Sequence, residues 1–507
     1  MKDQYVLAMY DIRGKQEYIY RSNHIKEIMG GSAIIEDCFK DYLYPAAKSY
    51  RNQMQNHNDE QQAIYLYDKD TENVEEFSRE AFKSRMEGEQ YLGEVVYEGG
   101  GNFFVLYKNK EVCVGVNKIF TKKLLEETYS LKVLCTYIEK VDFDNYKEDR
   151  KRLYEKHRLH EAKGSPVIPA QVLPFTQIDA RTSMPLYKMQ KTVKKPEKEE
   201  KVSRESYFKY RKYWERQEEN PEEFGEYILD NIVRKKGEDS LLAMIYIDGN
   251  NMGAKVQNCL EDKQTYEECI CQLREFSREI QKNYITVPMK KIDEALENSG
   301  NGRRRRYVIY AGDEITFICN AHDAYHMAKT YLETLPKGCS SCAGIAIFHS
   351  HAPYADVYRI AEECCESGKK KMKSEEIEDA SLIDVHYCQS GIGIDLESIR
   401  EKEVADLISK PWFVKLPEEK KKKDYVTTAM VEALAQELNK MGRSNVKGLA
   451  EYAKKGLADL KMDLKRIEAH SKKELNIDVS LGETLEEEQI RKMIYDIVIL
   501  YDLWFVE

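Results

Sequence analysis

One stretch, residues 241–319, constrains the fold of this chain more than any other part of the sequence. It begins with the apolar run 241–247, which stops at Asp248 and continues as Gly-Asn-Asn. An unbroken apolar run of this length, closed by glycine and asparagine, is typical of a strand that is buried on both faces. Farther on, two β-rich runs, 307–310 and 315–319, flank the tetrapeptide Ala-Gly-Asp-Glu, and this pattern predicts a hairpin.

Acidic side chains lie at the ends of these predicted strands. If the hairpin pairs with the first strand, Asp248 and Asp313 meet at one end of the sheet, with Glu314 beside them. Converging carboxylates repel each other unless a hard cation lies between them, and Mg²⁺ prefers oxygen ligands. Each motif taken singly is more often an ordinary turn, because Asn and Gly tolerate left-handed backbone. Together and in this order they indicate two-metal phosphoryl or nucleotidyl transfer.

A further strand and a helix follow the hairpin. Residues 342–348 predict a strand, and the helix that begins near Pro353 has apolar residues at helical spacing. We expect this helix to end at the lysine run 369–371, where lysines complement the helix dipole and can also reach phosphate oxygens.

This segment resembles the palm domain shared by GGDEF nucleotide cyclases and by the large polymerase-like subunit of type III CRISPR effector complexes. In those families an Asp-Gly-Asp-Asn-type strand end and a Gly-Gly-Asp-Asp or Gly-Gly-Asp-Glu-Phe hairpin hold the metals. A later helix supplies a phosphate-binding lysine, which falls on Lys369 here. The resemblance implies an α+β fold of two ferredoxin-like palm (nucleotide cyclase) domains and a C-terminal helical bundle.

The resemblance also implies roles for individual residues. The catalytic residues would be Asp248, Asp313 and Glu314, and these three with the backbone carbonyl of Gly249 would ligate two Mg²⁺ or Mn²⁺ ions. The residues expected to contact the nucleotide are Gly249, Asn250, Asn251, Gly312, Lys369 and Lys370. The sequence departs from the family at Asn250, where a second Asp is common, and at Ala311, which replaces the first Gly of the hairpin.

The N-terminal part repeats the same order of elements. A strand at 5–11 is followed by a long helix toward Ala46, a glycine-turn hairpin at 98–107, a helix at 111–127 and a strand at 131–139. We interpret this order as a diverged internal duplication. The first copy carries Asn102 at its hairpin tip instead of a carboxylate, so we predict that it does no chemistry and forms the opposite wall of a nucleotide cleft.

Four domains are expected along the chain. They are a first palm-like domain (1–142), a helical and irregular connector (143–237), a second palm with the Ala-Gly-Asp-Glu hairpin (238–395) and a C-terminal helical domain (396–507). Within them we predict a solvated Lys/Glu-rich spacer at 191–205, a helix at 206–236, a final edge strand at 381–386 and a capping box formed by Thr484 with Glu487. Many relatives begin with an HD nuclease domain, which is not expected here.

The composition restricts which binding partners and which cellular compartment are expected for the protein. The net charge of -10 argues against a chain-wide nucleic-acid surface, so any such contact is local, and even the run 303–306 of four arginines is more simply a solvated loop. Twelve scattered cysteines fit a reducing compartment, and the single Cys339–Cys342 spacing does not make a four-ligand zinc site. No signal peptide or membrane-length apolar run is present, which predicts a cytoplasmic protein without a membrane partner.

The sequence therefore favours a nucleotidyltransferase or cyclase of the type III CRISPR kind, active in antiviral defence. It would bind ATP with divalent metal and make cyclic oligoadenylate-type messengers, with guide RNA and effector subunits as further partners. One alternative is a catalytically degenerate scaffold or sensor subunit of an RNA-guided complex. Another is a diguanylate-cyclase-like enzyme that uses GTP.

Overall fold

The structure is a computed structural model of the chain. It describes residues 5–506 except 57, 70–73, 100–101, 165–172, 194–196, 222–223, 225–231, 233–239, 299–304, 389–393, 405–406, 418–419, 421–424, 472–474 and 476–484. Within the described part, no helix has both the length and the apolar character needed to cross a membrane.

The chain divides into two compact units. Unit 1 consists of Met1–Ile228, Asn251–Lys282 and Val308–Asp313, and unit 2 of Leu229–Asn250, Asn283–Tyr307 and Glu314–Glu507. Two helices from the middle of the sequence, α8 (Met252–Cys259) and α9 (Tyr266–Ile280), thus belong to unit 1. The division into four domains stays a prediction.

Unit 1 contains a five-stranded sheet in the order β2-β3-β4-β1-β5, with β1 antiparallel to both β4 and β5. Its strands are β1 (Val6–Arg13), β2 (Ile64–Tyr65), β3 (Gly93–Gly99), β4 (Asn102–Tyr107) and β5 (Lys132–Glu139). The predicted strands and the glycine-turn hairpin of the first copy are therefore confirmed.

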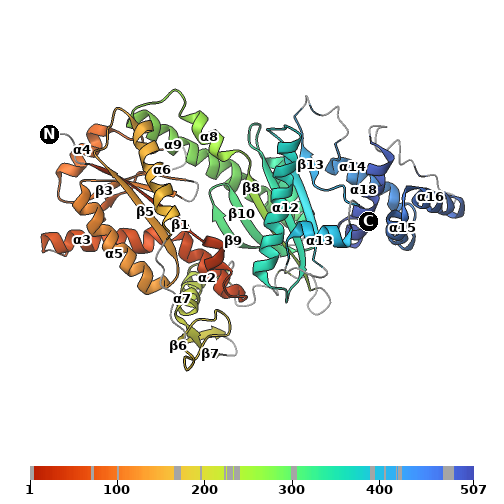
Figure 1. Cartoon of the computed structure of the whole chain (residues 1–507), viewed down its shortest axis with the longest axis horizontal. Coiled ribbons are helices and arrows are strands. Elements are labelled where there is room, and N and C mark those ends of the chain that lie inside the picture. The colour runs from red at the N-terminus through yellow and green to blue at the C-terminus, as the bar shows by residue number, and fades with distance from the viewer. Residues whose placement is uncertain are drawn as a thin grey trace. The chain divides into compact units, whose positions relative to one another are not determined.

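Alternating residues of β1 separate the core of unit 1 into two layers. Val6, Ala8 and Tyr10 belong to one cluster, whereas Leu7 and Met9 belong to another, as the two-residue period of a strand requires. The first cluster is completed by α2 (Ile25–Glu36), α3 (Tyr44–Gln55) and α5 (Lys110–Thr128), and the second by α4 (Arg79–Glu87), α6 (Tyr146–Ala162) and α9. Figure 1 shows α6 lying across β5 of this sheet.

The long helix predicted after the first strand is interrupted. A short α1 (Lys15–Ile19) precedes α2, and a π-helix, η1 (Phe39–Leu43), separates α2 from α3. The helix predicted at 111–127 is present as α5, and it begins at an Asn109 cap whose side chain accepts from the amide of Val112.

The prediction of a solvated spacer at 191–205 is wrong. Two antiparallel strands, β6 (Leu186–Val193) and β7 (Lys198–Ser203), form a hairpin there and lead into α7 (Arg204–Glu219). The hairpin is anchored because the indole of Trp214 donates a hydrogen bond of 2.7 Å to the carbonyl of Lys191. The rest of the helix predicted at 206–236 lies mostly outside the described residues.

Unit 2 is built around a six-stranded sheet in the order β13-β12-β11-β8-β10-β9. Its strands are β8 (Leu241–Gly249), β9 (Arg305–Ala311), β10 (Glu314–Asn320), β11 (Ser341–His349), β12 (Ser381–Tyr387) and β13 (Trp412–Lys415). The first strand, hairpin and following strand predicted for this segment are confirmed. If the two-residue β2 is not counted, the first strand of each copy lies between its third and fourth strands, which is the ferredoxin-like order.

Two predictions at the borders of this sheet are wrong. Strand β12 is not an edge strand, because the four-residue β13 pairs antiparallel along it. Arg305 and Arg306 are not in a solvated loop, because both lie in β9 and are only 5% exposed. The guanidinium of Arg305 donates through Nε to Asp293 at 3.1 Å, which compensates its burial.

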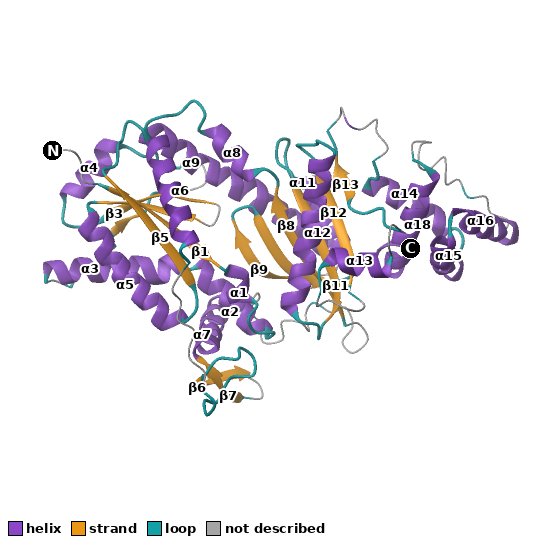
Figure 2. Cartoon of the chain, in the orientation of Figure 1, coloured by secondary structure: helices purple, strands orange, loops and turns teal. Residues whose placement is uncertain are grey.

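Helix α12 (Tyr354–Ser374) packs against β8, β11 and β12, as Figure 2 also shows. It begins after Pro353 and continues past the lysine run at which its end was predicted. Gly344 of β11 permits the close approach, because a Cβ atom at this position would meet the carbonyl oxygen of Ala361 at 1.8 Å.

A helical C-terminal region is confirmed from residue 396 onward, and the described part of unit 2 contains these remaining helices. They are η2 (Gln281–Thr286, shared with unit 1), α10 (Val287–Asn298), α11 (Ala324–Thr334), α13 (Leu396–Glu403), α14 (Thr428–Asn439), α15 (Arg443–Lys455), α16 (Leu457–Ser471), α18 (Glu487–Leu500) and the π-helix η4 (Tyr501–Phe505). Gly456 separates α15 from α16, and the capping box of α18 is formed by Glu486 and Gln489. The predicted cap Thr484 lies outside the described residues.

Candidate active site

Asp248 lies at the end of β8 and is ion-paired with Lys369 of α12. Both side chains are about one quarter exposed, at 24% and 25%. Burial opposes the charge of Lys369, but the carboxylate of Asp248 outweighs burial and raises the pKa of Lys369 above its ordinary value. Lys369 therefore stays protonated, and a second acidic partner, Glu366, lies 3.3 Å from its ammonium.

Glu314 opens β10, the strand beside β8. The register pairs Ile315 with Ile247, so continuing it by one residue sets Glu314 across from Asp248. The hydroxyl of Tyr358 donates to Glu314 Oε1 at 3.3 Å. These contacts hold the carboxylate of Glu314 near the strand end.

Tyr246 lies close enough to both Asp248 and Glu314 for their negative charges to affect its hydroxyl. Burial raises the pKa of its hydroxyl first, and the negative charges of Glu314 and Asp248 raise it further. The ring of Tyr246 meets that of Tyr358 edge-on, with centroids 5.5 Å apart. The structure thus brings Asp248, Glu314 and Lys369 together from three elements.

The residues after Asp248 have different surroundings. Gly249 is paired with Ser341 in the sheet. Asn250 is only 2% exposed, and its side-chain amide donates to the carbonyl of Ala380 at 3.0 Å, so it faces the protein interior. Asn251 is exposed, takes a left-handed conformation with φ 59° and forms the N-cap of α8.

Three other predicted residues lie elsewhere. Lys370 is exposed on α12, one position beyond Lys369. Gly312 and Asp313 form the tip of the β9–β10 hairpin, where Gly312 has a φ of 68° that glycine adopts at no steric cost.

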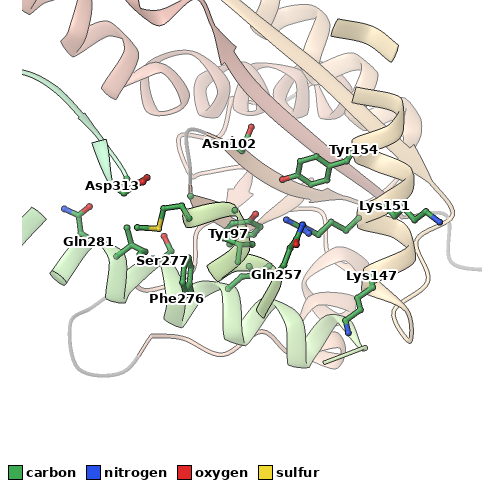
Figure 3. A pocket seen from close by; sticks show the side chains of 18 of the residues that line it. Tyr97, Asn102, Lys147, Lys151, Tyr154, Gln257, Phe276, Ser277, Gln281 and Asp313 are labelled. Carbon is green, nitrogen blue, oxygen red and sulfur yellow. The ribbon is translucent and has the colours of Figure 1, made fainter. Parts of the chain in front are cut away.

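Asp313 lines a cavity of about 640 Å³ whose described walls all belong to unit 1. The β3–β4 hairpin contributes Asn102, α6 contributes Lys151 and Tyr154, and α8 and α9 contribute Gln257 and Ser277 among others (Figure 3). A cavity of this size is ample for a small ligand such as a nucleotide.

The electrostatic character of this cavity comes mainly from α6. Its lining includes four basic side chains from this helix, which outnumber the acidic Glu155 and Asp313; the four are Lys147, Arg150, Lys151 and Arg158. The guanidinium of Arg150 also lies over the ring of Tyr154, 4.8 Å from its centroid. The cavity therefore favours an anionic ligand with an aromatic part.

At the equivalent strand end of the first copy, the aspartate has different partners from those of Asp248. Asp11 of β1 contacts the imidazole Nε2 of His157 at 3.1 Å and the guanidinium of Arg13 at 3.1 Å. The other ring nitrogen of His157 lies 3.2 Å from Thr136 Oγ1. His157, on the buried face of α6, was not among the residues predicted from the sequence, because a single histidine in a charged segment carries no specific signal.

A divalent cation near Asp248 would need several oxygen donors. Across the described ranges, no group of three or more His, Cys, Asp and Glu side chains is arranged to hold a metal ion. The two converging carboxylates of Asp248 and Glu314 nevertheless provide the oxygen donors that Mg²⁺ and Mn²⁺ prefer, and Lys369 already balances one of them. The described residues thus offer two acidic donors of the right chemistry, fewer than the three that a preformed metal site would show.

One segment of the chain matches a known protein family. Residues 241–377 match the family model described as Cas10/Cmr2, second palm domain. No curated protein matches the sequence.

Several solved structures are similar to this chain. A Csm1-Csm4 cassette in complex with pppApApA has 12% identity and a TM-score of 0.49, covering 98% of this chain and 69% of that one. A Csm1-Csm4 cassette in complex with AMPPNP has 15% identity and a TM-score of 0.41, covering 75% and 54%. Csm1 in T. onnurineus has 12% identity and a TM-score of 0.46, covering 97% and 70%.

The matched residues include the whole of β8, the β9–β10 hairpin, β11 and α12, and hence Asp248, Asp313, Glu314 and Lys369. The predicted resemblance is confirmed for this segment: residues 241–377 match the second palm domain of Cas10/Cmr2 proteins.

Proposed function

We propose that the protein is a metal-dependent nucleotidyltransferase of the type III CRISPR kind that joins and cyclises ATP into cyclic oligoadenylate-type messengers. The observation that carries the proposal is the convergence of Asp248, Glu314 and Lys369 inside the matched second palm domain. Two acidic side chains and one lysine are the charges that binding of a metal-triphosphate requires.

Asp248, Asp313 and Glu314 would hold the divalent cations, with the backbone of Gly249 as a further oxygen donor. Asp313 precedes Glu314 directly in the chain, and Glu314 is set across from Asp248 by the sheet register. When bound, the cations would neutralise phosphate charge and favour attack on phosphorus.

The chain's own residues bind the substrate and move the proton. In each step a 3′-hydroxyl attacks an α-phosphate, a phosphodiester bond forms, and pyrophosphate leaves. Glu314 takes the hydroxyl proton, and Lys369 balances the charge of the triphosphate. Gly312 lines the cavity of unit 1, and the exposed Lys370 and Asn251 are further proposed nucleotide contacts. The buried amide of Asn250 holds the strand end in place.

The cavity of unit 1 supports the nucleotide part of the proposal. Arg150 and Lys151 supply positive charge for phosphates, and Tyr154 supplies an aromatic surface for a base. The first copy contributes binding and no chemistry, because Asp11 is committed to His157 and Arg13.

Incubation with ATP and Mg²⁺ or Mn²⁺, followed by mass analysis of the products, tests the proposal. We expect 3′,5′-linked oligoadenylates, linear or cyclic, and free pyrophosphate from the wild type, and neither from Asp248→Asn. A parallel reaction with GTP decides the base, since a guanylate product without an adenylate one would make the protein a diguanylate-cyclase-like enzyme. Absence of any product, with RNA and partner subunits also supplied, would overturn the enzymatic proposal.

A non-catalytic scaffold or sensor is the second candidate, and one observation favours it. The ammonium of Lys369 already neutralises Asp248, and the residue that the family commonly has as a second Asp is the buried Asn250. Calorimetric titration separates the two functions. If the protein is the enzyme, it binds ATP in a metal-dependent way and Asp313→Ala abolishes that binding. If it is a scaffold, no such binding is observed.

Guide RNA and other subunits of an effector complex are the proposed macromolecular partners. Affinity purification from cells that express a complete type III system tests this. We expect a ribonucleoprotein particle that contains the chain and a guide RNA, and recovery of the chain alone would contradict the assignment.

A further inference from the structure

Arg274 is a buried cation in α9, the helix that forms one wall of the large cavity of unit 1. Its guanidinium donates to the carbonyls of Val96 at 2.8 Å, Glu75 at 2.9 Å and Val95 at 3.0 Å. A fourth contact, of 3.3 Å, joins it to the carboxylate of Glu94, which is itself buried. Loss of these bonds would leave several buried polar groups without partners, so Arg274 strongly favours one position of α9.

The contacts of Arg274 fasten α9 to an irregular part of the edge of the sheet. Strand β2 pairs with β3 only at Gly93 and Glu94. Just beyond, the pairing of β3 with β4 shifts register between Val95 and Tyr97. Such an irregularity leaves backbone groups that the sheet does not pair in the regular way. Arg274 thus joins α9 to a part of β3 where strand pairing alone does not fix the structure.

Arg274 does not line the cavity, but its neighbours on α9 do. Four of them contribute to the lining: Leu273, Phe276, Ser277 and Ile280. Figure 3 shows Phe276 and Ser277 on the same helix of the cavity wall. The hydroxyl of Ser277 adds a second anchor, because it donates to the carbonyl of Glu98 of β3 at 2.6 Å. Since a helix moves as one element, a shift of α9 against β3 would displace all of these lining side chains together.

The acidic partner of Arg274 has a second cation. Arg85 of α4 donates to Oε2 of Glu94 through Nε at 3.1 Å and Nη2 at 2.8 Å, whereas Arg274 contacts Oε1. Glu94 therefore keeps a counter-charge when Arg274 is replaced by a neutral residue, so the replacement does not leave an unpaired buried carboxylate.

We propose that Arg274 is a positioning residue for the nucleotide: it fixes α9 on the edge of β3, shapes the wall of the cavity, and so sets nucleotide affinity without taking part in the chemistry. The role rests on the proposed function in one respect only, the binding of a nucleotide in this cavity.

Fluorescence titration of the full chain with a labelled ATP analogue tests the role. Arg274→Met keeps an unbranched side chain and removes all four polar contacts. We expect it to raise the dissociation constant by about tenfold or more, since a displacement of about 1 Å in a binding site can cost up to about a hundredfold. Turnover at saturating ATP should stay within about twofold of the wild type, because the groups that carry out the chemistry are unchanged. A loss of stability alone would instead lower turnover at every ATP concentration and leave the dissociation constant unaltered.

Arg51 of α3 is the matched control. It is equally buried, and its guanidinium donates to four backbone carbonyls elsewhere in unit 1. Arg51 does not line the cavity, so Arg51→Met should lower stability by a similar amount and leave the dissociation constant unchanged. Equal rises in the two variants would overturn the positioning role, as would an unchanged constant in Arg274→Met.

Arg274→Lys keeps the positive charge and loses the planar fork, so it should raise the dissociation constant by a smaller factor than Arg274→Met. If Arg274→Met does not fold, an unchanged dissociation constant in Arg274→Lys would overturn the role in its place.

Hydrogen exchange of the ligand-free protein separates the role of Arg274 from the proposed chemistry. Amides of α9 should exchange faster in Arg274→Met than in the wild type and at the wild-type rate in Arg51→Met, and unchanged exchange in Arg274→Met would overturn the role. A wild type that binds ATP but forms no product would contradict the proposed chemistry and leave the positioning role intact. A wild type that does not bind the labelled ATP would overturn the positioning role as well.

Discussion

The ammonium of Lys369 is ion-paired with the carboxylate of Asp248, although the two residues are 121 positions apart in the sequence. The pair joins the end of the central strand β8 to the last third of α12. A lysine in this place keeps the site assembled before any nucleotide arrives, because it offsets the repulsion between Asp248 and the neighbouring Glu314.

Removing the charge of Asp248 should remove activity. We expect Asp248→Asn to lower the rate of nucleotide turnover by about a hundredfold or more, because charge stabilisation at the reacting phosphate is lost. Product formation from ATP measures this. Glu366→Gln, which removes the other acidic partner of Lys369 from the surface of α12, is the matched control and should retain most of the activity. Equal losses in the two variants would contradict the role of Asp248.

The corresponding aspartate of the first copy should be dispensable for chemistry. Asp11 is bonded to His157 and Arg13 within unit 1, so Asp11→Asn is expected to keep turnover within about twofold of the wild type while lowering stability by about 1–3 kcal/mol. Activity and urea unfolding measured on the same preparation separate the two effects. A turnover rate as low as that of Asp248→Asn would show that the first palm is catalytic.

Reversing one charge in the basic wall of the large cavity should weaken nucleotide binding. Lys151→Glu is expected to raise the dissociation constant for ATP by about tenfold, and the effect should shrink as salt is added. Lys122→Glu is the control, because Lys122 is 76% exposed on α5 and does not line the cavity. Fluorescence titration with a labelled ATP analogue measures both constants.

A methyl group on Gly344 should separate α12 from the sheet. The added Cβ would meet the Ala361 carbonyl at 1.8 Å and the Cys365 amide nitrogen at 2.5 Å, so we expect Gly344→Ala to destabilise unit 2 by about 1–3 kcal/mol or more. Gly448→Ala, in the open middle of α15, should instead stabilise the protein by about 0.4–1 kcal/mol. Denaturant unfolding of the two variants gives the comparison.

Asp384 should make stability depend on acid pH. Burial alone would raise the pKa of this carboxyl, but the bidentate Arg400 outweighs burial and holds the pKa below its ordinary value. The stabilisation is therefore present above the unfolded pKa of about 3.9 and is lost as the pH falls through the lower folded value. Asp384→Asn should remove this acid-dependent component, because it leaves Arg400 unpaired at every pH.

The measurement is the urea midpoint between about pH 7 and about pH 3, where the wild type should lose more stability than Asp384→Asn. At neutral pH the variant should be less stable by about 3–5 kcal/mol, as expected when one partner of a buried ion pair is removed. Asp379→Asn changes an exposed carboxylate in the same segment and should follow the wild type throughout.

The sequence was most informative where hydrophobic pattern and motif agreed. Three elements show this: β8, the hairpin around Gly312 and the strand at 342–348. Each has either an unbroken apolar run or a clear alternation of apolar and polar residues, and long-range packing does not alter elements with so strong a pattern. The pairing of Glu314 with Asp248 follows directly from that hairpin, which is why two of the candidate site residues were identifiable without coordinates.

Other elements depend on contacts that no local pattern encodes. The hairpin β6–β7 is rich in Lys and Glu, and it is a pair of strands because of cross-strand hydrogen bonds and its anchor at Trp214. Strand β13 is only four residues long and exists by pairing with β12. Helices α8 and α9 come next after β8, a strand of unit 2, so sequence order alone would place them in unit 2. Their long-range packing places them in unit 1 instead.

The contacts of the buried Asn250 amide limit which side chains can replace it at the end of β8. Its nitrogen meets the carbonyl of Ala380 at 3.0 Å and the thioether of Met372 at 3.5 Å. A carboxylate there would face an oxygen and a sulfur lone pair with no counter-charge, so an aspartate at position 250 would require remodelling of both neighbours. The Asn250 amide therefore ties the end of β8 to α12 and to the segment before β12, a bridging role that a metal-ligating carboxylate could not fill in these surroundings.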